Sequence, residues 1–323
     1  MVKTTKKTTK KIPKATVPQV TKPKVDQVAI RQRVTDAMVQ ALIEGTPPWR
    51  QPWSGGTGQM APCNFMTHRH YRGINPLLLL FSSMTKGLTS PYWGTQISWE
   101  KQHAKVRQGQ EPTHVLLYML VPVIENGKKK KNVQGNDVLH PFMREYPLYN
   151  FDQLDVPEGV LDKCKVKMEV RNTEDIFAPA EALIEATNAE IHYKGVRAYY
   201  QLDVDKIFCP PKETFDSMAD FYETVGHELM HWCSGKGRIA QKQVVGNQYA
   251  FNELVAEIGA CILLLELGVP AAEQMLAPSA AYVKSWAERM GNDPKFIFDA
   301  AVQAGKNVSY ILAFQPKKKK RAA

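Results

Sequence analysis

The sequence contains 323 residues, of which 44% are hydrophobic and 23% are charged. These proportions are ordinary for a soluble globular protein, and the chain is long enough for one large domain or two ordinary ones. The longest apolar run, 76–81, is too short to cross a bilayer, and the lysine-rich start lacks the apolar stretch of a secretory signal. The five cysteines form no CxxC pair, which favours a reducing compartment over a disulfide scaffold. We therefore expect a cytoplasmic protein that does not contact a membrane.

The net charge of +10 is concentrated at the two ends of the chain. Residues 1–24 carry eight lysines and no acidic residue, and residues 317–321 add five more cations. Between them, residues 25–160 have a balance of +3 and residues 161–316 a balance of −6. Basic arms attract polyanions with little sequence preference, although each arm taken alone is equally typical of a solvated tail. This distribution argues against an acidic mimic of DNA.

Residues 1–24 lack the apolar content needed to order themselves, so we expect a disordered basic arm there. A first domain is expected over residues 25–157, with a mixture of helices and strands. Its predicted elements are helices over 25–44, 75–86 and 99–106, a strand over 114–125, a hairpin tip at Asn126-Gly127 and a return strand over 143–151.

A second, mostly helical domain is expected over residues 158–314, followed by a basic tail over 315–323. Its predicted elements are a helix over 176–189, a strand over 198–207, and helices over 217–232, 249–267, 280–290 and 295–304. The predicted fold class is therefore α+β, with a small sheet in the second domain.

The most informative motif is His227-Glu228-Leu229-Met230-His231, an HExxH pattern inside a predicted helix. A spacing of four residues places both imidazoles on one helix face, where they can share a metal ion. Glu228 lies beside them and is placed to act as the general base on a water molecule. Two structural histidines are the less specific interpretation of the same pattern. The favoured interpretation is a zinc site with Glu228 as its catalytic residue.

A third ligand is available in Asn252-Glu253-Leu254-Val255-Ala256-Glu257, which resembles the NExxxD/E pattern of gluzincin metallopeptidases. That resemblance implies Glu253 as the third zinc ligand and Glu257 as the carboxylate that orients an imidazole. The metzincin pattern fails, because it requires Gly at 234 and His at 237, where this chain has Ser234 and Gly237. Four tyrosines are candidate oxyanion donors among which the sequence does not choose: Tyr199, Tyr249, Tyr282 and Tyr310. Cys63, His68 and His70 lack a fourth partner for a second zinc site.

A series of N-terminal motifs points to one family. The series consists of Pro48-Trp49, Pro52-Trp53, Tyr71-Arg72-Gly73-Ile74-Asn75, Trp93-Gly94-Thr95-Gln96, Val106-Arg107-Gln108-Gly109 and Tyr149-Asn150-Phe151-Asp152-Gln153. It resembles the N-terminal domain of ArdC-type antirestriction proteins, which also occurs in TraC-type plasmid primases. The half that contains the HExxH motif resembles the zincin-like domain that follows it in that family. The resemblance covers about residues 26–312 and implies single-stranded DNA binding by the first domain.

Aromatic platforms combined with a positive groove are the usual means of holding a single strand. The candidate DNA-binding residues are Arg50, Trp53, Arg69, Tyr71, Arg72, Lys105 and Arg107. Trp93 and Trp99 are better explained as core residues. By the family resemblance, the protein would protect incoming plasmid or phage DNA from host restriction, either by coating the strand or by cleaving a host protein. The alternatives are a DNA-coating protein whose zinc is purely structural, and a primase accessory module.

Overall fold

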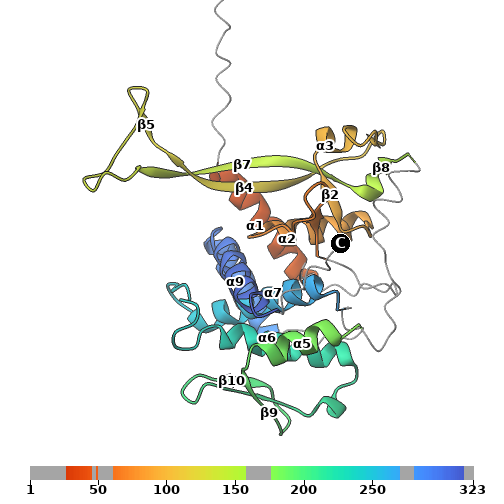
Figure 1. Ribbon diagram of the computed structural model, residues 1–323, viewed down its shortest axis with the longest axis vertical. Coiled ribbons are helices and arrows are strands. Elements are labelled where there is room, and N and C mark those ends of the chain that lie inside the picture. The colour runs from red at the N-terminus through yellow and green to blue at the C-terminus, as the bar shows by residue number, and fades with distance from the viewer. Residues whose placement is uncertain (1–26, 46–48, 50–60, 158–175, 270–279, 316–323) are drawn as a thin grey trace, which may run out of the picture.

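The computed structural model describes residues 27–45, 49, 61–157, 176–269 and 280–315 (Figure 1). The predicted N-terminal arm, the predicted basic tail beyond residue 315 and residue 158, where the second domain is predicted to begin, lie outside these ranges. Within the described residues no helix is long and apolar enough to cross a membrane.

The N-terminal half is organised around a four-stranded sheet in the order β1-β2-β7-β4. Its strands are β1 (Cys63–Asn64), β2 (Tyr92–Gly94), β4 (Thr113–Pro122) and β7 (Leu139–Asn150). The two long strands pair antiparallel from Thr113↔Leu148 to Pro122↔Leu139, and they form the ribbon across the upper part of Figure 1. Beyond the Pro122↔Leu139 end of the ribbon, β5 (Ile124–Glu125) and β6 (Lys128–Lys129) form the predicted hairpin. Asn126 and Gly127 turn it with positive φ angles.

The predicted helices over 25–44 and 75–86 are present as α1 (Gln27–Ile43) and α2 (Asn75–Lys86), and both lie below this ribbon. The expected helix over 99–106 is wrong in its second part. Helix α3 (Gln96–Glu100) ends early, and β3 (Lys105–Val106) pairs with β8 (Leu154–Asp155) after the short η1 (Phe151–Gln153). The chain leaves the helix because His103 adopts a left-handed φ of 61°, which an α-helix does not allow.

In the described residues of the C-terminal half, five α-helices combine with a three-stranded sheet in the order β10-β11-β9. The elements are α5 (Ala178–Ala186), β9 (Glu190–Tyr193), β10 (Tyr199–Gln201), β11 (Lys206–Cys209), η2 (Lys212–Thr214), α6 (Met218–Trp232), α7 (Gln248–Leu267), α8 (Ala280–Asn292) and α9 (Phe296–Leu312). The single strand expected over 198–207 is wrong. It is two antiparallel strands, because the chain turns at 202–205 with Asp205 at a φ of 57°. Helix α9 also continues two turns beyond its predicted end at Ala304.

The two halves share one hydrophobic core. Met38 of α1, Leu77 of α2 and Met143 of β7 belong to the same buried cluster as residues of α6, α7, α8 and α9. Trp49 meets Trp286 of α8 edge to face, with ring centroids 6.1 Å apart. Trp93 and Trp99 are fully buried, as the sequence predicts. The N-terminal sheet is therefore fixed against the helices that carry the HExxH motif.

Candidate metal centre

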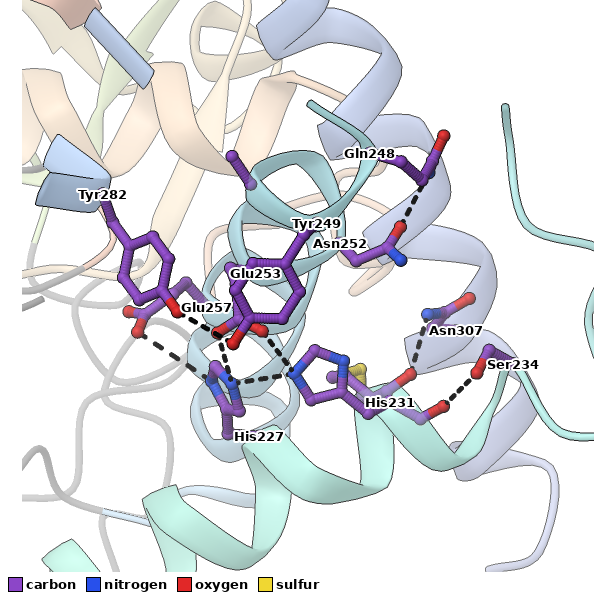
Figure 2. Close-up of polar contacts among 12 residues, drawn as sticks. His227, His231, Ser234, Gln248, Tyr249, Asn252, Glu253, Glu257, Tyr282 and Asn307 are labelled. Carbon is purple, nitrogen blue, oxygen red and sulfur yellow. Dashed lines mark hydrogen bonds and ion pairs between the residues drawn. The ribbon is translucent and has the colours of Figure 1, made fainter. Parts of the chain in front are cut away.

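Helices α6 and α7 lie side by side and carry the predicted metal ligands (Figure 2). Ser217 caps the start of α6 by accepting from the Asp220 backbone N–H, and Asn247 caps α7 in the same way through Ala250. Gly259 permits their close approach, because a Cβ at this position would lie 2.5 Å from Met230 Sδ. The sequence therefore brings the middle of α6 against the first turns of α7.

Three predicted ligands converge between these helices. His227 Nε2 lies 3.5 Å from Glu253 Oε2, His231 Nε2 lies 3.4 Å from Glu253 Oε1, and the two Nε2 atoms are 3.1 Å apart. Each residue offers one ligand atom, and these atoms lie within 4.8 Å of one another. Among the described residues this is the one group of three or more His, Cys, Asp or Glu side chains with that geometry. The arrangement fits a single metal ion held by two imidazoles and one carboxylate.

The electrostatics of the cluster reflect its burial. Burial alone would lower the pKa of His227, but the hydrogen bond with Glu253 and the negative charges of Glu257 and Glu228 raise it overall. Burial acts on Glu253 in the opposite direction, yet its hydrogen bonds with His227 and His231 lower its pKa to about 2. The Glu253 carboxylate is therefore ionised, which is the state that a metal ligand needs.

Glu228 lies beside the ligand cluster as the HExxH pattern requires. Its side chain is buried, and its Oε2 has no hydrogen-bond partner among the described residues. Burial raises the pKa of this carboxyl group, and the nearby His227 and His231 partly offset the shift, with a smaller contribution from the Tyr200 backbone. An unpartnered buried oxygen next to three convergent ligands is what a base awaiting a water molecule would present.

Glu257 and two tyrosines surround the three ligands (Figure 2). Glu257 Oε1 lies 3.9 Å from His227 Nδ1, on the side of the ring away from Glu253. The Tyr282 hydroxyl donates to the Tyr249 hydroxyl over 2.8 Å. Hydrogen bonding to Tyr282, burial and the adjacent Glu253 raise the pKa of Tyr249. Of the four candidate tyrosines, the structure places these two beside the candidate metal ligands.

The other two tyrosines lie elsewhere. Tyr199 stacks on Phe208 within the sheet, and Tyr310 packs with Trp232 and Phe314. Cys233 also points away from the ligands, since its thiol lies 3.8 Å from the Asn307 carbonyl in the core and burial raises its pKa to about 12.

A charged clamp fixes strand β10 beside α6, and the sequence alone does not reveal it. Arg238 Nη1 lies 3.0 Å from Asp205 Oδ2, and its guanidinium stacks over the Trp232 ring at 4.1 Å. The Tyr200 hydroxyl joins both partners, donating to Asp205 over 2.8 Å and accepting from Arg238 over 3.0 Å. The clamp holds the Tyr200 backbone next to Glu228, whose pKa it lowers slightly. It therefore links the edge of the sheet to the candidate base.

The candidate DNA-binding residues occupy several different places. Tyr71 is half-buried, its hydroxyl lies 3.4 Å from Asn64 Nδ2, and burial raises its pKa to about 12. Arg107 Nη1 donates to the Leu154 carbonyl over 2.9 Å, so its guanidinium braces the β3–β8 pair. Lys105 is exposed on β3.

Two further candidates are described by the structure. Arg69 is exposed in the turn before α2. Arg72 forms a bidentate ion pair with Glu266 of α7, which joins the two halves of the molecule. Arg50 and Trp53 lie outside the described residues.

Comparison with known proteins matches the two halves separately. Residues 28–149 match the N-terminal domain of the anti-restriction factor ArdC, and residues 178–303 match a zincin-like metallopeptidase. Two crystal structures of the antirestriction ArdC protein from the R388 plasmid, one metal-free and one Mn(II)-bound, are 31% and 30% identical to this chain. Both alignments cover 90% of this chain and 99% of the R388 protein, with TM-scores of 0.71 and 0.68. The chain belongs to the ArdC antirestriction family.

Two TraC DNA primases of Escherichia coli are also similar to this ArdC-family chain, with 31% and 30% identity over 88% of its length. The chain spans only 27% and 20% of the length of those primases. The comparisons confirm the predicted α+β fold class and the family resemblance. The zincin-like match, the Mn(II)-bound relative and the three convergent ligands together indicate a divalent metal.

Proposed function

We propose that this ArdC-family protein binds single-stranded DNA, carries a zinc peptidase site, and protects incoming plasmid or phage DNA from host restriction in the cytoplasm. The observation that supports the peptidase component is the convergence of His227, His231 and Glu253 beside a buried Glu228 with an unpartnered oxygen. Two imidazoles and a carboxylate are a ligand set that zinc accepts, with a further coordination position left for water or substrate.

The bound zinc would supply a Lewis acid that polarises the scissile carbonyl and lowers the pKa of the attacking water. His227, His231 and Glu253 would hold the metal, and Glu257 would fix the ring orientation of His227 through Nδ1. Glu228 would accept the proton of the attacking water at its unpartnered Oε2. Tyr249 would donate a hydrogen bond to the developing oxyanion, because its raised pKa keeps the hydroxyl protonated.

The peptide substrate would be held by strand β10. This strand pairs only with β11 within the described sheet, and it is an edge strand next to helix α6. An extended peptide can add to such an edge through backbone hydrogen bonds. The link between the Tyr200 backbone and Glu228 would then connect the bound peptide to the base. The substrate we propose is a host protein engaged at the DNA.

The decisive experiment is Glu228→Gln, assayed by the transfer of single-stranded plasmid DNA into a restricting host. The substitution preserves the size of the side chain and removes the base, so we expect turnover to fall about 10²- to 10⁴-fold. Protection should be lost while metal content and DNA affinity stay at wild-type levels. Glu288→Gln, on the exposed side of α8, provides the matched control. Full protection by Glu228→Gln would refute proteolysis and leave DNA coating as the function.

The DNA component has its own test. The full chain should bind a single-stranded oligonucleotide more tightly than the duplex of the same sequence, with strong salt dependence. Equal affinity for the two forms would contradict single-strand recognition.

A further inference from the structure

A cleft of about 1040 Å³ lies between the two halves of the molecule, away from the metal ligands. One wall is helix α9, and the opposite wall comes from strands β4 and β7, the start of α2 and one residue of α1. In Figure 1, α9 lies beneath the β4–β7 ribbon. At the floor the walls almost touch, since a Cβ on Gly305 would lie 3.9 Å from the Gly73 backbone nitrogen.

One face of α9 provides the chemistry of this cleft. Lys295, Phe298, Val302, Lys306 and Tyr310 all line it, and their spacing of three or four residues places them on a single helix face. Lys295 and Lys306 are about 16 Å apart along the helix axis. That distance corresponds to about five nucleotides at the duplex rise of 3.4 Å, and to fewer in an extended strand. The face therefore alternates cations with apolar and aromatic surface.

The opposite wall repeats this combination. Leu117 of β4 and Met143 of β7 give it an apolar surface, and Arg31 of α1 and Arg72 place guanidinium groups at its edge. An amphipathic ligand would therefore meet apolar surface and cations on both walls.

The charges in the cleft are mostly uncompensated. Arg31, Lys295 and Lys306 form no ion pair within the part of the chain that the structure describes. The one acidic residue of the lining, Asp299, is already engaged by Lys242 over 2.9 Å. These cations are notable because residues 161–316 as a whole carry a balance of −6. Lys295 and Lys306 thus form a local positive site on a negatively charged half.

We propose that this cleft holds a segment of single-stranded DNA. The phosphates lie along Arg31, Lys295 and Lys306, and the bases contact Phe298 and Tyr310. A positive track with aromatic surface is the combination that binds single strands without sequence preference. The inference rests on the proposed DNA-binding function and locates part of it outside the domain that the motifs indicated. A strand bound here contacts both halves, and so it stabilises their packing.

The test measures binding of an oligodeoxythymidine to the full chain as a function of salt. The double variant Lys295→Gln/Lys306→Gln removes two phosphate contacts, so the slope of log K against log salt should become less steep by about 1.4. Wild type should then lose roughly sevenfold more affinity than this variant between 50 and 200 mM salt. The matched control is Lys236→Gln/Lys284→Gln, which removes two exposed lysines that do not line the cleft. Its slope should equal that of wild type.

Lysine acetylation read by mass spectrometry provides the second measurement. The oligonucleotide should protect Lys295 and Lys306 while Lys236 and Lys284 remain reactive. If wild type binds and the cleft variant behaves like the control, with no protection in the cleft, the inference is overturned and DNA binding stands. If wild type itself does not bind, the proposed DNA-binding function fails, and the inference fails with it.

Discussion

Replacing Glu253 should remove most of the stabilisation that a bound metal gives. Its two carboxylate oxygens lie 3.5 and 3.4 Å from the two histidine Nε2 atoms, so it is placed to share a metal ion with them. Glu257 Oε1 lies 3.9 Å from Nδ1 of His227, the ring nitrogen away from Glu253, and would act on a bound metal through that ring. The structure therefore predicts different losses for Glu253→Gln and Glu257→Gln.

The magnitudes follow from binding linkage. Zinc at about 1,000 times its wild-type Kd stabilises the folded state by about 4.1 kcal/mol. For a chain of this size that corresponds to a rise in Tm of roughly 6 °C. Removing a carboxylate that orients a ligand typically lowers metal affinity 10- to 100-fold. In Glu257→Gln, zinc at the same concentration would therefore still stabilise the folded state by about 1.4 to 2.7 kcal/mol. If Glu253→Gln lowers zinc affinity about 1,000-fold, the stabilisation by zinc falls to only about 0.4 kcal/mol, which corresponds to a rise in Tm of about 1 °C.

The assay is differential scanning fluorimetry with and without zinc, at constant pH, with zinc content measured on the same samples. The rise in Tm on adding zinc is compared rather than Tm itself, because each substitution also changes the stability of the metal-free protein. The expected order is wild type, then Glu257→Gln, then Glu253→Gln. The reasoning would be refuted if zinc raised the Tm of Glu253→Gln as much as that of wild type but did not raise the Tm of Glu257→Gln. That result would make Glu257 the third ligand.

The remaining predictions concern the surroundings of the site. Tyr249→Phe removes the proposed oxyanion donor, so peptidase turnover should fall about 10²- to 10³-fold with zinc content unchanged; unchanged turnover would exclude this role. Gly259→Leu forces a side chain against Met230, and urea denaturation should show a loss of about 1–3 kcal/mol. Arg238 lowers the pKa of Asp205, so the stability from this pair is present above the ordinary aspartate pKa and is lost as pH falls through the lowered one. The free energy of unfolding of Arg238→Ala should therefore change less with pH in that acidic range than that of wild type. An equal pH dependence in the two proteins would contradict a stabilising Arg238–Asp205 pair.

The convergence of the candidate metal ligands was predictable because the information for it is local. His227 and His231 are one helical turn apart, and Glu253 and Glu257 are one turn apart on a second helix, so two short patterns identify all four residues. The clamp of Arg238, Asp205 and Tyr200 was not predictable, since its members lie up to 38 residues apart in the sequence. Their contact depends on how the β10–β11 turn folds back onto α6.

The distance in sequence between interacting residues also explains why the sequence did not show which DNA-binding candidates are available. Arg107 looks available in the sequence, but its partners, the carbonyls of Asp152 and Leu154, are 45 and 47 residues away. Lys295 and Lys306 carry no motif, and their common helix face has no evident role until the β4–β7 ribbon lies opposite. Sequence patterns identify residues whose partners are near in the chain. They do not identify a surface that two halves create together.

The shared core also changes how the two halves should be studied. Helix α1 buries Ile30, Val34, Met38 and Leu42 in the core shared with the C-terminal half, and Thr35 donates to the Pro294 carbonyl over 3.0 Å. At about 1.5–3 kcal/mol for each side chain, these four contribute on the order of 6–12 kcal/mol as an upper estimate. That is comparable to the whole stability of a typical domain.

A fragment of residues 1–157 would expose this apolar face of α1. We therefore expect the fragment to aggregate or to unfold without cooperativity, and the full chain to unfold in one calorimetric transition. Two separate transitions in the full chain, together with a well-folded fragment, would show that the halves are energetically independent. If the halves are coupled as the core indicates, a failure of the isolated fragment to bind DNA reports its instability. DNA binding should accordingly be measured on the intact chain, where both walls of the cleft are present.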